Sequence, residues 1–166
     1  PVDLFDALKT TGKNAGESNE DYRLRLKSSL DAESRLVEAP QEKANLFRLQ
    51  LGFVLLNDRP AKGQLKWAKE QAKSLGYAGN GARSIRELVA VAELMMTART
   101  DEHGVARVVP LEIVQRPWAQ VRRAARTFSV TGKLEGKLPG KPWTPERALK
   151  ALDSALRRAR ALVPQH

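Results

Sequence analysis

Arginine side chains recur on one segment near the end of the sequence, where a helix is expected from Pro117 to Phe128. At about 100° per residue, one face of this helix is apolar and is formed by Trp118, Val121, Ala124, Ala125 and Phe128. The opposite face is expected to carry three cations, Arg122, Arg123 and Arg126. Guanidinium groups are planar forks of hydrogen-bond donors that match the oxygens of a phosphate. The pattern predicts a helix that packs on a core and presents phosphate-binding groups.

A second segment repeats this pattern closer to the end of the chain. Thr144-Pro145 predicts the start of a helix running to about Leu162, since proline fits the first turn of a helix. Its apolar stripe is formed by Ala148, Leu152, Ala155, Leu156, Ala159 and Val163. Its other face is expected to carry Lys150, Arg157 and Arg160. One charged helix face is usually only solvated, but two such faces close together favour a binding surface.

The loop between these two helices contains three tetrads that each begin with Gly-Lys. Their cations are Lys133, Lys137 and Lys141. Glycine lets the backbone approach a ligand closely, and lysine supplies a mobile positive charge for a phosphate. Two interpretations stay open, a phosphate-binding loop and an exposed turn kept soluble by its lysines. Trp143, at the end of the loop, either stacks on an unpaired base or anchors the final helix.

The charge of the whole chain favours a polyanionic partner. The 166 residues include 29 Lys and Arg against 19 Asp and Glu, a formal net charge of +10. Residues 1–60 hold 9 basic and 10 acidic residues, whereas residues 116–166 hold 12 basic and only 3 acidic residues. A surplus that served solubility alone would be spread evenly. The asymmetry therefore indicates a localised basic surface.

Helical patterns also dominate the segments that must position this surface. Helices are expected over residues 2–9, 18–37, 41–56, 61–75 and 85–97. Ser18 and Ser84 each precede an acidic residue by three positions and predict two capping boxes. Gly76 is placed to end a helix in the left-handed conformation. The segment 85–97 is apolar nearly all round, which predicts the central core helix and a buried Leu94.

The fold class expected from these patterns is mainly α, a compact multi-helix domain of about five to six helices. The β-branched residues of 105–114 predict at most a short β-hairpin near 105–114, split at Pro110. Residues 1–100 are expected to form a helical scaffold, and residues 101–166 a basic C-terminal part of the same compact unit. That part contains the two amphipathic helices and the Gly-Lys loop.

Several kinds of chemistry have no support in the sequence. The chain has no cysteine, which excludes disulfides, thiolate zinc sites and cysteine nucleophiles. Its two histidines, His103 and His166, are too few for a histidine metal cluster. Residues 79–84 lack the final glycine of a dinucleotide fingerprint, and residues 132–137 do not match a phosphate-binding Walker loop. No catalytic residue, metal or cofactor is therefore predicted.

We expect a non-enzymatic nucleic-acid-binding protein that contacts the phosphate backbone of DNA or RNA. No complete base-reading motif is present, so backbone contacts are favoured over sequence readout. Two alternatives stay open: a protein–protein adaptor or regulatory subunit whose basic face meets an acidic partner, and a metal-dependent nucleic-acid-processing enzyme with scattered carboxylates. The start of the chain lacks the pattern of a signal peptide and no apolar run approaches the ~18 residues of a membrane span, which predicts a soluble cytoplasmic protein without membrane contact.

Overall fold

The computed structural model describes residues 13–34, 41–96, 99–100, 103–104, 106–107, 109, 111–131, 150 and 154. The described residues are mainly helical, as the sequence predicts, and form α2 (Asn19–Ser34), α3 (Gln41–Asp58), α4 (Gln64–Ser74), α5 (Gly81–Met96) and α6 (Trp118–Thr131). Before α6 come the two short strands β1 (Arg99–Thr100) and β2 (Ala106–Arg107) and the 3-10 helix η1 (Leu111–Gln115). The helix expected over 2–9, the Gly-Lys loop and most of the last helix lie outside the described residues.

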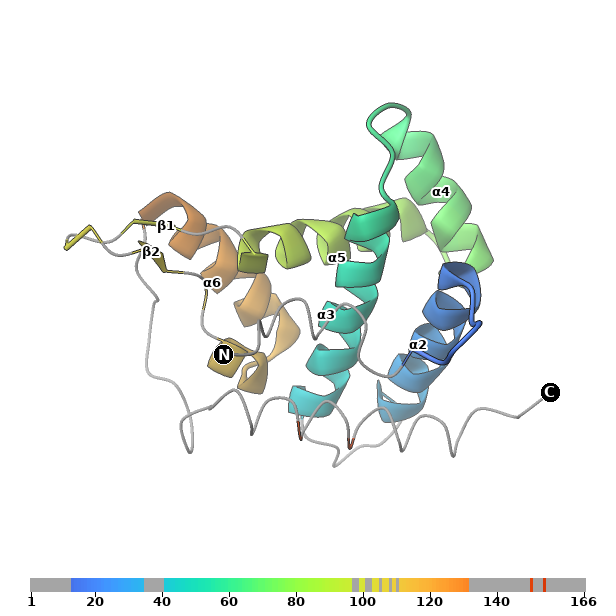
Figure 1. Cartoon of the computed structure of the whole chain (residues 1–166), viewed down its shortest axis with the longest axis horizontal. Coiled ribbons are helices and arrows are strands. Elements are labelled where there is room, and N and C mark those ends of the chain that lie inside the picture. Colours follow the sequence, from blue (N-terminus) through green and yellow to red (C-terminus); the bar gives the residue numbers. More distant parts are fainter. Residues whose placement is uncertain are drawn as a thin grey trace.

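Helix α3 lies in the middle of the bundle, with α2 packed along one side and α5 crossing it (Figure 1). The other two helices pack on α5, with α4 towards one end of it and α6 towards the other. Phe47, Leu51 and Phe53 of α3 are fully buried, as are Tyr22 and Leu26 of α2. One core therefore runs through all five helices, with α3 and α5 at its centre.

The crossing of α3 and α5 depends on a glycine. A Cβ atom built on Gly52 would lie 2.6 Å from the backbone oxygen of Leu88 and 3.2 Å from the Cβ of Ala92. Only a residue without a side chain fits there, because packed backbone leaves no room for an added methyl group. The absence of a side chain at this position sets how closely the two central helices approach.

Helix α5 is central, as expected, but Leu94 is not part of the buried core. Ala92 and Met95 are fully buried, whereas Leu94 is half-buried and Ala90 is exposed. A helix that packs on α3, α4 and α6 still leaves one strip to solvent, and Leu94 lies beside that strip. The expectation of a buried Leu94 is wrong, and its neighbour Met95 holds that place in the core.

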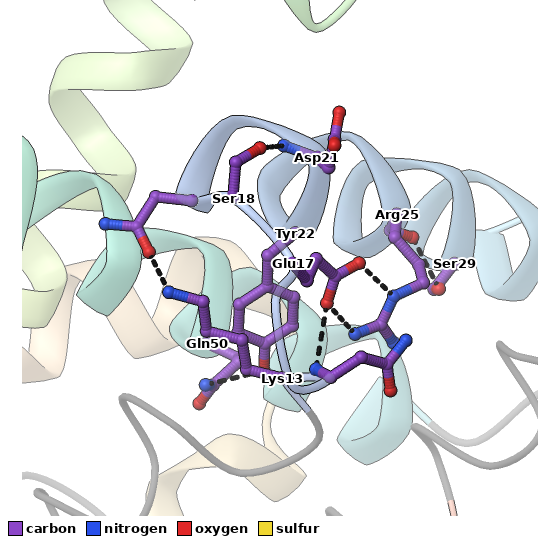
Figure 2. Close-up of polar contacts among 10 residues, drawn as sticks. Lys13, Glu17, Ser18, Asp21, Tyr22, Arg25, Ser29 and Gln50 are labelled. Carbon is purple, nitrogen blue, oxygen red and sulfur yellow. Dashed lines mark hydrogen bonds and ion pairs between the residues drawn. The ribbon is translucent and has the colours of Figure 1, made fainter.

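The start of α2 is fixed by the local hydrogen bonds shown in Figure 2. The Oγ of Ser18 accepts a hydrogen bond from the backbone N–H of Asp21 at 3.1 Å, which confirms the serine half of the predicted capping box. The carboxylate of Glu17 accepts two hydrogen bonds from Arg25, at 2.7 and 3.0 Å. Farther along the helix, the hydroxyl of Tyr22 accepts a hydrogen bond from Nε2 of Gln50 in α3 at 3.0 Å. A cap and a buried polar contact thus orient α2 on the bundle.

The turn between α4 and α5 agrees with one predicted signal and corrects another. Gly76 has a φ of 77° and donates to the carbonyl of Lys73, while Tyr77 donates to the carbonyl of Ala72, which is the Schellman arrangement. The capping box expected at Ser84 is wrong, because α5 already begins at Gly81. A Cβ atom on Gly81 would lie 2.8 Å from the Cβ atoms of Ala72 and Tyr77. The helix therefore begins earlier than expected, at a glycine that packs closely against α4 and the turn after it.

The segment expected to form a hairpin folds in a different way. Strand β2 lies within it, but pairs antiparallel with residues before it, Arg99 opposite Arg107 and Thr100 opposite Ala106. The strand expected over 111–114 is wrong, since these residues form η1. Adjacent residues of a strand point to opposite faces, whereas Ile113 and Val114 are both fully buried. A tight helical turn allows both side chains to enter the core.

Candidate nucleic-acid interface

The structure locates four of the nine predicted phosphate-binding residues. Arg122, Arg123 and Arg126 all lie on α6, and Lys150 is helical and exposed. The other five lie outside the described residues: Lys133, Lys137, Lys141, Arg157 and Arg160. Within the described residues, the predicted interface is therefore represented mainly by α6.

Helix α6 is held against the bundle through its apolar face and its first turn. Val121, Ala124 and Ala125 are buried, and Trp118 packs half-buried against the core. Before the helix, the side-chain amide of Asn45 in α3 donates to the carbonyls of Val114 at 2.8 Å and Arg116 at 2.6 Å. Asn45 is fully buried, so these two hydrogen bonds fix the direction in which the chain enters α6.

Arg122 differs from the other two arginines of the predicted face. Its Nη1 lies 2.7 Å from Oε1 of Glu87 on α5, and its side chain is 37% exposed. Arg122 follows Trp118 by four residues and therefore lies next to it on the helix surface. Because Trp118 packs against the core, Arg122 lies at the border of the packed face. Its guanidinium thus joins α6 to α5, and the interaction with Glu87 neutralises much of its charge.

Arg123 and Arg126 lie on the outer face of α6, together with exposed Ala119 and Gln120. Neither arginine forms an ion pair with a residue that the structure describes. Residues 116–131 contain four arginines and no acidic residue. The outer face of α6 is therefore positively charged without local compensation, which is the arrangement that attracts phosphates.

A second group of exposed cations lies on α4 and was not identified from the sequence. Lys66, Lys69 and Lys73 follow at spacings of three and four residues, which places them on one side of the helix. All three are exposed, while Ala68 and Ala72 form the buried side. The regular spacing of these lysines in the sequence could have identified this group. Glu70 lies between them and reduces the net charge of this side of α4.

Two clefts open among residues expected to serve only as scaffold. The first, which we call the Trp67 cleft, has a volume of about 370 Å³ and lies between α4 and the outer face of α5. Three of its lining residues are Arg59, Arg83 and Arg86. Arg59 lies 3.0 Å from Glu93, and Arg83 lies 3.5 Å from Glu87, so each has an acidic neighbour. Arg59 is therefore compensated by Glu93, but Arg83 shares Glu87 with the closer Arg122, and Arg86 forms no ion pair with a described residue.

The second cleft, which we call the Arg48 cleft, has a volume of about 260 Å³ and is lined by residues of α2, α3, α5 and α6 and of the turn before α5. Arg48 of α3 extends over the ring of Trp118, with its guanidinium carbon 5.5 Å from the ring centre. Lys27 of α2 lies 4.4 Å from the ring centre of Tyr77. Two cations and two aromatic rings thus meet in one small space.

No group of three or more His, Cys, Asp or Glu side chains is placed to hold a metal ion within the part of the chain that the structure describes. Among the same residues, no helix is long and apolar enough to cross a membrane. No protein-family model matches the chain, and comparisons with curated proteins and with solved structures find no similar protein. The residues of this chain are therefore the only indication of its function.

Proposed function

We propose that the protein binds nucleic acid without catalysing a reaction, and that it contacts the phosphate backbone through a basic surface centred on α6. The main support is that Arg123 and Arg126 are both exposed on a helix that has no acidic residue of its own. Surface charge of one sign that no neighbour compensates is the electrostatic signature of a phosphate-binding surface.

The packing of α6 supports this role because different residues of the helix face the bundle and the solvent. Apolar residues and Arg122 hold the helix in place, so Arg123 and Arg126 make no contribution to the core and are available to a ligand. Lys150, which is also exposed, would add to the same surface, together with the predicted lysines of the Gly-Lys loop and Arg157 and Arg160. Binding would then release counterions from the nucleic acid, which is the main driving force of backbone recognition.

A salt titration tests the proposed function. The full chain is mixed with single- and double-stranded DNA and RNA of unrelated sequences, and the affinity is measured over a range of salt concentrations. The logarithm of the affinity is expected to fall linearly with the logarithm of salt, with a slope of about −0.9 per contacted phosphate on duplex DNA and about −0.7 on single strands. Affinities for different sequences of one nucleic-acid type are expected to agree.

Two parallel measurements separate the alternatives. An acidic protein at the same ionic strength tests the adaptor hypothesis, which predicts stronger binding to that protein than to any oligonucleotide. Incubation of labelled DNA and RNA with magnesium or manganese tests the enzyme hypothesis, which predicts cleaved or modified products. Absence of binding at low salt, or binding that salt does not weaken, would contradict the proposed function.

A further inference from the structure

The Arg48 cleft contains a cation that the protein does not neutralise. Arg48 is half-buried, and its Nη1 donates to Oδ1 of Asn45 at 2.7 Å. It forms no ion pair with any described residue. Burial lowers the pKa of Arg48, since its charged form is removed from water. A partly desolvated charge without a partner is costly, and proteins normally pair such a group or bind a counter-ion to it.

The other charged groups of the cleft are already matched. Nζ of Lys27 lies 2.7 Å from Asp31 on the same helix, and Glu87 lies 2.7 Å from Arg122. Both carboxylates line the cleft, yet each has its own cation. The sum of these formal charges leaves a single positive charge, on Arg48. A ligand with one negative charge would complete the balance, whereas a highly charged anion would be repelled by the two carboxylates.

Two hydroxyl groups in the cleft are free to donate hydrogen bonds. Tyr77 and Ser84 line it, and neither side chain forms a hydrogen bond with a described residue. Burial raises the pKa of Tyr77 to about 12, so its hydroxyl keeps its proton at neutral pH and remains a donor. Lys27 above its ring holds the tyrosine in place. A guanidinium and two hydroxyls offer several donors to an oxyanion.

The size and the remaining walls of the cleft restrict the ligand further. Its volume of about 260 Å³ lies just below the ~300–1,000 Å³ typical of sites for drug-sized ligands. Leu30 and Leu88 supply apolar walls beside the rings of Tyr77 and Trp118. A small anion with a compact apolar body fits this combination better than a bare inorganic ion does.

We propose that the Arg48 cleft binds the oxyanion group of a small organic acid carrying one negative charge, a carboxylate or a phosphodiester. Arg48 is the counter-charge, and the hydroxyls of Tyr77 and Ser84 orient the oxyanion. This site is separate from the outer face of α6 and does not depend on the proposed nucleic-acid binding.

The test measures binding of benzoate and of dimethyl phosphate to the full chain by calorimetry and by thermal unfolding. Benzyl alcohol, which has the shape of benzoate without its charge, is the ligand control. A Kd of about 1 mM or tighter is expected for at least one of the two anions, and the stronger one identifies the oxyanion class. Trp118 beside Arg48 is expected to report binding through a change in fluorescence that Trp118→Phe removes.

Three variants locate the site. Arg48→Met removes the charge, keeps a long side chain, and is expected to weaken anion binding at least tenfold. Tyr77→Phe keeps the ring and is expected to weaken it several-fold, which provides a second test if Arg48→Met does not fold. Arg86→Gln removes an exposed arginine from the Trp67 cleft and is expected to leave the affinity unchanged.

Stability without ligand is measured separately from binding. Arg48→Met also removes the hydrogen bond to Oδ1 of the buried Asn45 and the contact with the ring of Trp118, so its melting temperature is expected to be lower. Tyr77→Phe removes no hydrogen bond with a described residue and is expected to melt close to the unmodified chain. The proposal is overturned if neither anion binds, if Arg48→Met or Tyr77→Phe binds as tightly as the unmodified chain, or if benzyl alcohol binds as well as benzoate.

Discussion

Helices α5 and α6 both carry arginines on their solvent-facing sides, and they differ in what surrounds those arginines. On α5, Arg83 lies 3.5 Å from Glu87, and the same surface includes Glu93, which pairs with Arg59. On α6, Arg123 and Arg126 have no acidic residue within residues 116–131. Helix α5 thus carries as many glutamates as arginines, whereas α6 has three arginines and no acidic residue of its own, and Arg123 and Arg126 are left for a partner.

The two helices also differ in how they are held. Helix α5 packs on α3, α4 and α6, and its approach to α3 leaves no room for a side chain at position 52. Helix α6 packs through one face, with Asn45 fixing its entry and Arg122 bridging to α5. Helix α5 therefore stabilises the bundle, and α6 packs on it at the periphery. Substitutions can separate the two roles.

The largest effect is expected in the core of α5, from two adjacent residues. Met95→Ala removes a fully buried side chain and is expected to lower the free energy of unfolding by about 2–5 kcal/mol. Leu94→Ala removes a half-buried one and is expected to cost only about 1 kcal/mol. Chemical denaturation measures both values. Equal losses would mean that α5 lies deeper in the bundle than the structure places it.

A smaller loss is expected where α6 is joined to α3. Asn45→Ala leaves the carbonyls of Val114 and Arg116 without their buried donor, which is expected to cost about 2 kcal/mol in the free energy of unfolding. Asn57→Ala at the exposed end of α3 is the matched control and is expected to change little. If Asn45→Ala were as stable as the control, the position of α6 would not depend on this contact.

The smallest stability effects are expected for the arginines of α6. Arg122→Gln removes the interaction with Glu87 at a half-exposed site and is expected to cost less than about 1 kcal/mol. Arg123→Gln removes no ion pair and is expected to stay within about 0.5 kcal/mol of the unmodified chain. Urea denaturation compares the two. If Arg123→Gln lowered the free energy of unfolding more than Arg122→Gln did, Arg123 rather than Arg122 would be the arginine that holds α6 on the bundle.

The sequence predicted those features of the fold that depend on local patterns. The bounds of α3, the cap at Ser18 and the left-handed end at Gly76 follow from periodicity and from single residues whose chemistry acts nearby. The helical turn at 111–115 did not follow, because β-branched residues favour strands until burial of both Ile113 and Val114 selects another conformation. The early start of α5 likewise depends on how closely Gly81 packs on the preceding helix.

The candidate sites also divide into features that local sequence patterns predict and features that depend on packing. Arg123 and Arg126 were expected on an exposed face from helical spacing alone. The pairing of Arg122 with Glu87 could not be predicted, since it joins residues 35 positions apart on two helices. The Arg48 cleft requires four helices to meet and therefore leaves no pattern in the sequence. Spacing identifies a face of one helix, but only the packed bundle shows which charges are already compensated.

The most direct measurement is the salt dependence of nucleic-acid affinity for two charge-matched double variants. Arg123→Gln with Arg126→Gln removes two positive charges from α6, and Lys69→Gln with Lys73→Gln removes two from α4. We expect the α6 variant to bind all sequences more weakly and to lower the salt slope by up to about two units, with unchanged stability. The α4 variant is expected to bind nearly as the unmodified chain does. Normal binding by the α6 variant, or a larger loss for the α4 variant, would contradict an interface centred on α6.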